Sequence, residues 1–333
     1  MKIILDCHVP ALLAHGGAQI QIEQTQRALA AIGVEAEFMR WWDATQTGDV
    51  IHFFGRMPAD QIRFAQTKGL KVVMAELLTA SGSQNSAQRL ARRIFRWTAE
   101  NFAPRGITAA FQWESYQLAD ACIANTSWEK HLMEFKFGAD PKKIFVVPNG
   151  VEEVFLQSPA VPRGEWLVCT ATITERKRVL ELAQAAVAAQ TPVWIIGQAY
   201  ADNDSYAQKF FAFAKQNPKF IRYEGAVRDR AALANIHRAA RGFVLLSAME
   251  TRSLAAEEAA ACACPLLLSD LPWARSVFGE RATYCPLANV AATAAVLKKF
   301  YDTAPALPLP LPPATWRAAA EQLKSVYENV LVD

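Results

Sequence analysis

The chain has 333 residues, with 35 Lys and Arg against 32 Asp and Glu, for a formal net charge of +3. This mild balance gives no reason to expect a nucleic-acid partner. A hydrophobic fraction of 52% with 20% charged residues excludes a disordered chain, and the length favours two domains of ordinary size.

The sequence also argues against a membrane-spanning protein, a disulfide-bonded protein and a metal-binding protein. No apolar run reaches the about eighteen residues of a membrane-spanning helix, and Asp6 comes too early for a signal-peptide core, so we expect a cytoplasmic protein. The six cysteines are scattered, mostly in apolar runs, and we interpret them as buried thiols. Cys262 and Cys264 are too close for a usual zinc pair. We therefore predict no metal and no cofactor.

The first half of the chain alternates buried strands with helices. Gly16 and Gly17 lie in a loop before a predicted helix over 18–32, which Gly33 ends. Such alternation is typical of a parallel α/β sheet. The strand-like runs are 2–7, 34–39, 50–54, 72–75, 121–124 and 144–147.

The second half repeats this alternation after a predicted linker over 152–162. A proline-rich stretch over 303–313 then leads to a last helix over 316–331, with Thr315 as its N-cap. We predict an α/β fold of two Rossmann-like, doubly wound domains facing a cleft. The expected domains are 1–156 and 157–314, with 315–333 packing back on the first. The strand-like runs of this half are 166–169, 193–196, 220–223, 243–246 and 266–268.

Residues 242–281 combine two strand-like runs with a helix whose start is rich in carboxylates. If Ser253 caps this helix, Glu250 in the loop and Glu258 in the helix can face one pocket. Paired carboxylates suit a polyhydroxylated ligand, and amides at a helix start suit a phosphate. The alternative is that Glu257 and Glu258 are solvated first-turn residues that complement the helix dipole.

Seven residues separate Glu250 from Glu258, and this spacing resembles the E-x7-E motif of GT-B glycosyltransferases of family 4. Four other segments also resemble that family, in the right order along the chain. These segments are 16–19 (GGAQ), 49–52 (DVIH), 119–127 (ADACIANTS) and 142–150 (KKIFVVPNG).

The resemblance implies roles for a glycine loop and two cations. Gly16 and Gly17 would let backbone amides approach the donor diphosphate, although an ordinary turn is an equally good interpretation. Arg176 and Lys177 would stabilise the diphosphate leaving group. The alternative, a solvated charge cluster, is weakened because cations at a helix start oppose its dipole. The family's arginine has no match here, since Thr172 stands at its position.

The same resemblance assigns the carboxylates. Glu250 would hold hydroxyls of the donor sugar, and Glu258 the ribose hydroxyls of the nucleotide. The family's glycine-rich continuation is replaced by Thr251, Arg252 and Ser253, so we expect Arg252 to narrow or recharge the pocket. The expected donor-binding residues are Gly16, Gly17, Arg176, Lys177, Glu250, Arg252, Ser253, Leu254 and Glu258. The expected catalytic residues are Glu250, Arg176, Lys177 and Glu76.

Glu76 enters as an acceptor-side carboxylate at a strand end, where family members often have a histidine. A strand-terminal surface glutamate is the competing interpretation. His52 ends another strand, and we interpret it as a structural histidine.

Residues 84–106 interleave five arginines with aromatic residues. A basic amphipathic helix of this kind can lie on an anionic membrane surface, which would place the protein peripherally at the inner membrane. The interpretation that we favour is an ordinary helix with a solvent-facing basic side.

The resemblance implies a retaining, metal-independent glycosyltransferase that moves a sugar from a nucleotide-diphosphate donor to an acceptor hydroxyl. The acceptor would be a glycan, a lipid-linked sugar or a small molecule. Two alternatives remain open: a nucleotide-sugar 2-epimerase on the same scaffold, and a non-catalytic two-lobe sugar-binding protein.

Overall fold

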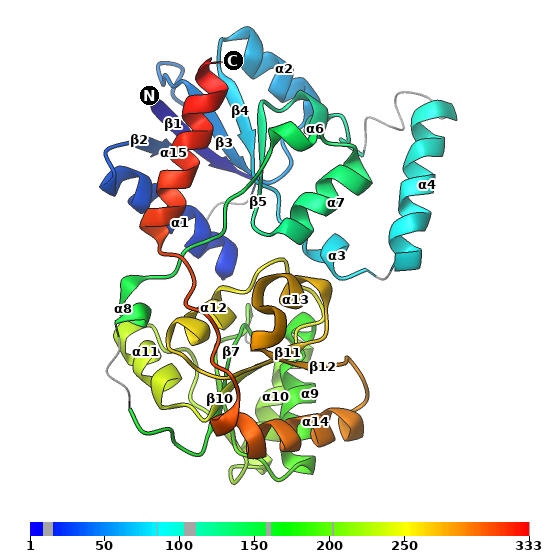
Figure 1. Cartoon of the computed structure of the whole chain (residues 1–333), viewed down its shortest axis with the longest axis vertical. Helices are drawn as coiled ribbons and strands as arrows, with labels where there is room; N and C mark the ends of the chain where they lie inside the picture. Colours follow the sequence, from blue (N-terminus) through cyan, green and yellow to red (C-terminus); the bar gives the residue numbers. More distant parts are fainter. Residues whose placement is uncertain (9–15, 85, 103–110, 158–160, 202, 333) are drawn as a thin grey trace. The chain divides into compact units, whose positions relative to one another are not determined.

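The computed structural model describes residues 1–8, 16–84, 86–102, 111–157, 161–201 and 203–332. The chain divides into two compact units, the first made of Met1–Gly150 and Ala314–Asp333, the second of Val151–Pro313 (Figure 1). The second unit begins earlier than the expected boundary after residue 156. The reason is helix α8 (Glu153–Leu156), which buries Phe155 against α11 (Arg230–Ala239) and α12 (Leu254–Ala261). The linker predicted over 152–162 is therefore partly helical.

The first unit contains a sheet of six parallel strands in the order β2-β1-β3-β4-β5-β6. Its central strands are almost entirely buried, as expected for a parallel sheet with both faces covered. The strands are β1 (Lys2–Cys7), β2 (Glu35–Phe38), β3 (Val50–Phe54), β4 (Lys71–Met74), β5 (Ala121–Ala124) and β6 (Ile144–Val146).

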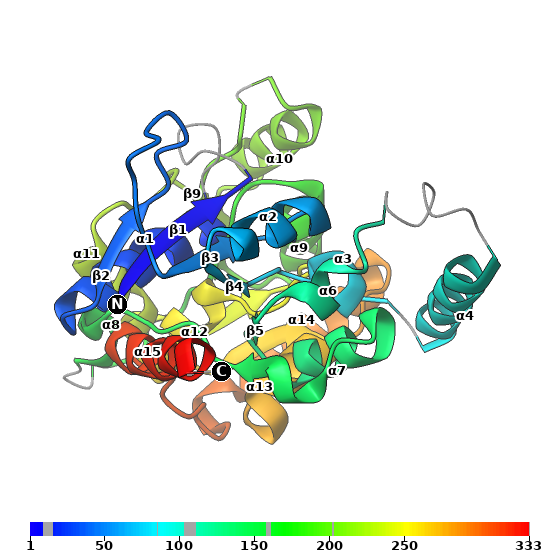
Figure 2. The same cartoon turned by 90° about the horizontal axis from the view of Figure 1, so that it is seen from above.

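Helices surround this sheet, and the last helix of the chain is one of them. Helix α15 runs beside α1, as Figures 1 and 2 show. The Thr315 hydroxyl accepts a hydrogen bond from the Ala318 amide at 3.1 Å, which confirms the expected N-cap. The described helices of the unit are α1 (Gly17–Ala31), α2 (Ala59–Thr67), α3 (Thr79–Gly82), α4 (Ser86–Phe102), α6 (Ser115–Leu118), α7 (Ser127–Phe137), the 3₁₀ turn η2 (Pro141–Lys143) and α15 (Trp316–Val332).

The start of α7 fixes the loop that follows β4. Thr126 is the N-cap and accepts from the Glu129 amide at 3.0 Å. Glu129 in turn accepts from the Asn125 amide and from the Leu78 amide, each at 2.8 Å. This extended capping box ties the end of β5 to the chain after β4, where Glu76 lies.

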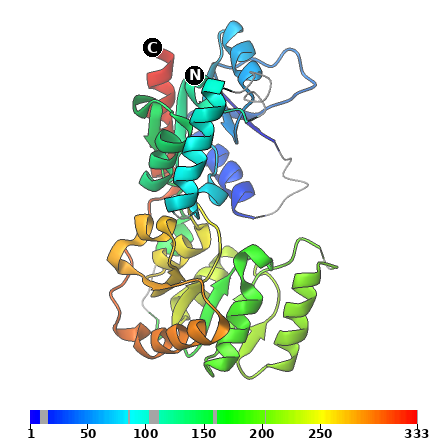
Figure 3. The ribbon, with the colours of Figure 1, turned by 90° about the vertical axis from the view of Figure 1, so that its right-hand side faces the viewer.

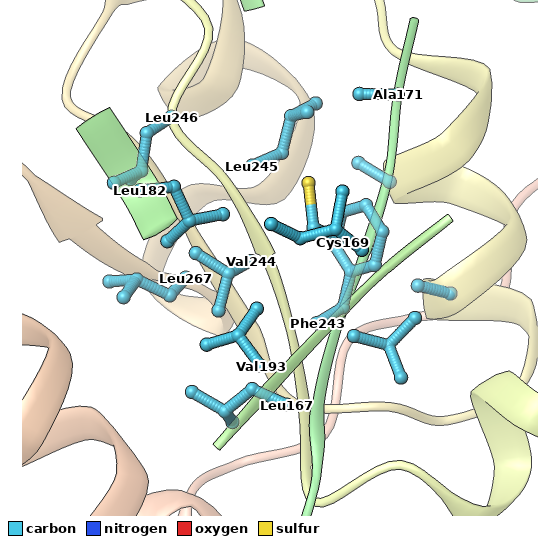
Figure 4. Close-up of a cluster of buried hydrophobic side chains, with 14 of the residues drawn as sticks. Leu167, Cys169, Ala171, Leu182, Val193, Phe243, Val244, Leu245, Leu246 and Leu267 are labelled. Atoms are coloured by element: carbon cyan, nitrogen blue, oxygen red, sulfur yellow. The ribbon is translucent and has the colours of Figure 1, made fainter. Parts of the chain in front are cut away.

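The second unit contains another sheet of six parallel strands, in the order β12-β11-β10-β7-β8-β9. Figure 4 shows apolar side chains of the neighbouring strands packing together in its core. In both units, each sequence-predicted strand matches a strand of the structure to within one residue at either end. Strand β12 is the one that the sequence did not predict. The strands are β7 (Leu167–Thr170), β8 (Val193–Ile196), β9 (Ile221–Tyr223), β10 (Gly242–Leu245), β11 (Leu266–Ser269) and β12 (Thr283–Cys285).

The helices of the second unit form two groups. The first comprises α9 (Val179–Ala188), α10 (Ser205–Gln216) and α14 (Val290–Thr303), and the second comprises α8, α11 and α12. Helix α13 (Pro272–Phe278) and the 3₁₀ turns η3 (Glu175–Lys177), η4 (Gly279–Arg281) and η5 (Ala304–Ala306) complete the unit. Among the helices described in either unit, none combines the length and the apolar character needed to cross a bilayer.

Gly150, where the chain leaves the first unit, lies against the point where it re-enters that unit. A Cβ at Gly150 would be 2.1 Å from the backbone nitrogen of Trp316 and 2.3 Å from the Thr315 carbonyl carbon. Only a residue without a side chain allows two backbones to approach so closely. The residues at which the chain leaves the first unit and returns to it are therefore in direct backbone contact.

Candidate functional site

The strand order of the second unit makes β7 and β10 a topological switch point. These strands are neighbours, but the chain continues from β7 toward β8 and from β10 toward β11, on opposite sides. In parallel sheets the loops diverge at such a switch point and leave a crevice at the carboxyl ends of the strands. The two loops meet here, because the Ala248 amide donates to the Arg176 carbonyl at 2.8 Å.

Glu250 lies in this meeting of loops with two cations. Its Oε1 atom accepts a hydrogen bond from Lys177 Nζ and lies 3.4 Å from Arg176 Nη1. Arg176 also donates to the Met249 carbonyl at 2.8 Å. The Glu250 and Lys177 side chains are only 9% and 13% exposed, so little solvent screens their charges. The structure thus brings together three of the predicted site residues.

The next three residues hold the loop through a buried ion pair. Ser253 is the N-cap of α12, as expected, and its hydroxyl accepts from the Ala256 amide at 3.3 Å. Arg252 donates to Glu257, whose side chain is 1% exposed. Burial raises the pKa of Glu257 and the Arg252 guanidinium opposes that rise. Leu254 is the first residue of α12 and is half-buried. Where the family resemblance implied glycines, the chain therefore has Arg252, whose charge is neutralised by Glu257.

Glu258 forms a second ionic group one residue further along α12. Arg230, at the start of α11, donates to Glu258 and, at 2.7 Å, to Glu152 Oε1. The Arg230 guanidinium also lies over the Phe155 ring, 4.7 Å from its centre. Glu257 and Glu258 are both buried, so the alternative of a solvated helix start is wrong. Burial raises the pKa of Glu258 to about 6, against the opposing effect of Arg230.

This raised pKa gives an expected pH dependence. The pKa of Glu258 is about 6 in the folded protein against an ordinary value of 4.5, so the fold prefers the protonated form. The stability that this preference contributes is fully present below pH 4.5 and is lost as the pH rises through 6. The contribution to the free energy of unfolding is on the order of 2 kcal/mol.

Glu258→Gln mimics the protonated carboxyl at every pH. We expect this variant to match the wild type near pH 4.5 and to be more stable by on the order of 2 kcal/mol near pH 7.5. Urea unfolding at several pH values measures the difference. A stability difference that stays constant over this range would contradict the raised pKa.

The first unit has its own switch point, between β1 and β3, and a pocket lies there. The order β2-β1-β3 sends the chain in opposite directions from these two strands. The pocket has a volume of about 670 Å³. It is lined by His8, Ala18, Gln21, Ile22, Phe54, Gly55, Arg56, Ala75, Glu76, Leu77, Phe111 and Gln112.

The predicted glycine loop adjoins this unit's first helix. Gly16 is the N-cap of α1, and its φ of 133° is one that residues with a side chain rarely adopt. Gly17 is the first helical residue. Both belong to the first unit, whereas Arg176, Lys177, Arg252 and the paired glutamates belong to the second.

Glu76 lies on the wall of the first unit's pocket in a charged network. Arg56 donates to it twice, through Nε at 2.7 Å and through Nη2 at 3.0 Å. The Tyr116 hydroxyl donates to the same carboxylate, and the Arg56 guanidinium lies 5.0 Å from the Tyr116 ring centre. Glu76 is therefore not the solvated surface residue of the competing interpretation. Its carboxylate is held in one orientation at the edge of a pocket.

His52 is structural, as expected. Its ring is buried, stacks on Phe54 and shares a 2.5 Å hydrogen bond between Nδ1 and the Tyr327 hydroxyl. Burial lowers the pKa of His52 to about 3, which keeps the ring neutral. Within the described part of the chain, no three His, Cys, Asp or Glu side chains cluster as metal ligands would.

Sequence reasoning missed Arg56, Tyr116, Arg230 and Glu152. Two of them carried a signal. Arg56 comes two residues after β3, at a strand end where ligand-binding residues gather. Arg230 is the first residue of α11, where a cation opposes the helix dipole and needs a partner. Nothing in the sequence indicated which carboxylates these arginines contact.

Comparison with family models and with curated proteins found no match. Solved structures, in contrast, resemble the whole chain. Sucrose-phosphate synthase from Thermosynechococcus elongatus superposes with a TM-score of 0.74 at 16% identity, covering 100% of both chains. A glycosyltransferase from Rickettsia africae gives 0.63 at 13% identity, covering 99% of this chain and 98% of that one. Anabaena HepE in complex with UDP gives 0.63 at 14% identity, covering 100% and 97%.

Identities this low establish a shared architecture and nothing finer. The architecture agrees with the two parallel sheets described above. The chain therefore has the α/β fold of two Rossmann-like domains that is found in GT-B glycosyltransferases.

Proposed function

We propose that the protein is a retaining, metal-independent glycosyltransferase of the family 4 type, which transfers a hexosyl group from a nucleotide-diphosphate sugar to an acceptor hydroxyl. The observation that carries the proposal is the contact of Glu250 with Lys177 and Arg176 at the switch point of the second sheet. Solved structures of similar fold include HepE with UDP and glucose.

The three side chains suit the chemistry of losing a diphosphate. Negative charge builds on the leaving group as the glycosidic bond breaks, and fixed cations nearby stabilise it. Lys177 and Arg176 are already held in place, by Glu250 and by the Met249 carbonyl. Glu250 is the proposed acceptor of hydroxyl hydrogen bonds from the donor sugar. The site therefore pairs cations for the phosphates with a carboxylate for the sugar.

Glu258 is the proposed acceptor of the ribose hydroxyls. A carboxylate offers about four acceptor positions, so the hydrogen bond from Arg230 does not exhaust it. Arg230 also keeps part of the Glu258 population ionised by opposing the effect of burial on its pKa. We infer that Arg230 preserves the charged form that binds hydroxyls best.

The acceptor is proposed to bind in the pocket of the first unit. Its polar lining (His8, Gln21, Gln112) and its aromatic lining (Phe54, Phe111) are the combination that sugar rings need, because they present hydroxyls at the edge and C–H groups on the face. Glu76 is the proposed carboxylate beside the reacting hydroxyl, oriented by Arg56. A glycan, a lipid-linked sugar or a small polyol fits this chemistry.

A thermal-shift panel of UDP, GDP, ADP and their sugars tests the donor site. At a ligand concentration of 100 Kd, binding adds about 2.7 kcal/mol, which raises the melting temperature of a domain of this size by about 5 °C or more. We expect one nucleotide and its sugars to give this rise. If none of them did, the donor-site assignment would fail.

Incubation of the protein with the selected donor alone separates the transferase from its alternatives. The transferase is expected to leave the sugar's configuration unchanged at carbon 2 and to hydrolyse the donor slowly. An epimerised sugar formed without an acceptor would identify a 2-epimerase instead. Tight binding of free sugar with no nucleotide affinity would identify a binding protein.

A further inference from the structure

A second, smaller cavity lies beside the pocket of the first unit. Its volume is about 20 Å³, and a water molecule needs about 10–15 Å³, so the cavity has room for one group of the size of a hydroxyl. Gln21, Phe54 and Ala75 line both the cavity and the larger pocket. The two spaces therefore share a wall made of these three residues.

The cavity lies between α1, the sheet and α15. Gln21 and Thr25 belong to α1, and His52 belongs to β3. Asn125 follows β5, and Asn149 comes after β6. Helix α15 packs on α1 and β4 and contributes apolar side chains to the cavity wall. Figure 3 shows this helix (red) along one side of the first unit.

The cavity wall is polar, but among the described residues no Asp, Glu, Lys or Arg lines it. Each of its five polar side chains is at most 7% exposed. Transfer of an ionised group into such a site is unfavourable unless an opposite charge neutralises it. The wall therefore favours a neutral hydroxyl over a phosphate, a carboxylate or an amine. The five polar residues are Gln21, Thr25, His52, Asn125 and Asn149.

One nitrogen of the His52 ring is left without a partner. Nδ1 shares a hydrogen bond with the Tyr327 hydroxyl, and Phe54 stacks on the ring. Nε2 is buried, and no described group forms a hydrogen bond with it. A buried polar atom without a partner is destabilising, so a ligand atom that pairs with Nε2 removes this unfavourable contribution.

The state of the His52 ring determines which kind of group can pair with it. Burial lowers the pKa of His52 to about 3, so the imidazole is neutral and Nε2 either donates or accepts, depending on the tautomer. The Tyr327 hydroxyl can pair with Nδ1 in either tautomer. A ligand hydroxyl both donates and accepts, so it can pair with Nε2 in both cases. A carbonyl only accepts and an ammonium group only donates, so neither has this property.

We propose that the cavity is a hydroxyl-binding subsite of the first unit's pocket, in which one hydroxyl of a bound sugar or polyol pairs with His52 Nε2. The inference rests on the acceptor pocket proposed above and adds a requirement for one particular hydroxyl. Gln21, on the shared wall, has the flexible side chain that turns aside when the hydroxyl enters. An acceptor without this hydroxyl leaves Nε2 unpaired and is expected to bind about tenfold more weakly.

NMR of the full chain with nitrogen-15 in its histidine rings tests the proposal, because His8 lines the pocket and His52 lines the cavity. The probes are the methyl glycosides of glucose, galactose and mannose, each compared with its monodeoxy analogues. We expect at least one parent glycoside to shift the resonances of both rings. One of its deoxy analogues should bind about tenfold more weakly and shift His8 alone.

His52→Asn tests the same contact from the side of the protein. The asparagine amide can replace Nδ1 as the partner of the Tyr327 hydroxyl, but it has no group at the position of Nε2. This variant should bind the parent glycoside and that deoxy analogue within about twofold of each other. Gln112→Asn is the control, since Gln112 lines the pocket but not the cavity. It should weaken both sugars alike and keep the difference of about tenfold.

The outcomes separate the subsite from the pocket. A glycoside that shifts His8 but not His52, with all its deoxy analogues bound equally well, would overturn the subsite and leave the acceptor pocket intact. The cavity would then hold water only. If no glycoside shifted either ring, the acceptor pocket would fail and the subsite with it. Circular dichroism checks that the variants are folded, and the comparison of sugars on the wild type decides the question without them.

Discussion

Glu250→Gln is expected to lower the turnover of the nucleotide sugar by about a hundredfold. The Glu250 carboxylate accepts a hydrogen bond from Lys177 and lies 3.4 Å from Arg176, which the Met249 carbonyl also holds. Glutamine keeps the shape of the side chain but removes the negative charge beside both cations, at the site proposed to bind the diphosphate. The same change removes an ionised acceptor for sugar hydroxyls. Steady-state kinetics with the donor selected by thermal shift measures kcat and KM separately.

Two further substitutions of the same type make this result specific. Glu175→Gln changes an exposed carboxylate in the same 3₁₀ turn as the cations and should leave kcat within about twofold. Glu258→Gln should act mainly on nucleotide affinity, because its proposed contact is with the ribose. Equal and negligible effects of the Glu250 and Glu258 variants would refute both assigned roles.

Gly150→Ala is expected to destabilise the first unit by on the order of 3–5 kcal/mol. The added Cβ would meet backbone atoms of Thr315 and Trp316 at 2.3 Å and 2.1 Å. Backbone cannot rotate away as a flexible side chain can, so α15 would have to shift from its place beside α1. Urea unfolding followed by circular dichroism measures the loss.

Gly33→Ala provides the contrast for this stability test. Gly33 has a φ of +79°, but an added Cβ there would meet none of the described atoms within 4 Å, so its substitution adds backbone strain without a collision. We expect it to cost about 1–2 kcal/mol. A loss at Gly150 no larger than that at Gly33 would show that the contact with α15 relaxes freely.

Most strands could be predicted from the sequence because a buried parallel strand consists of a short run of apolar residues. The runs 50–54, 121–124 and 193–196 coincide with β3, β5 and β8. Strand β12 escaped this pattern, since only Cys285 of its three residues is buried and it lies at the edge of its sheet. The helix α8 was missed for a similar reason, because four residues are too few to show a helical period.

The candidate site was predictable in its residues but not in its contacts. Glu250 and Glu258 stand out by their spacing, whereas Lys177 reaches Glu250 across 73 residues of sequence. That contact depends on β7 lying beside β10, which no local pattern reports. The pairing of Arg252 with Glu257 is local, five residues apart. It was still missed, because a charge at a helix start is ordinarily solvated and here it is buried.

The close approach of Gly150 to Trp316 has a topological consequence. The second unit is an insertion into the first, and both of its covalent attachments leave from one place. A single protease cut in either attachment would leave the two halves of the protein tethered by the other. The points where the chain leaves and re-enters the first unit already touch. The second unit could therefore be deleted and replaced by a short linker from residue 150 to residue 314, with α15 kept in the remaining domain.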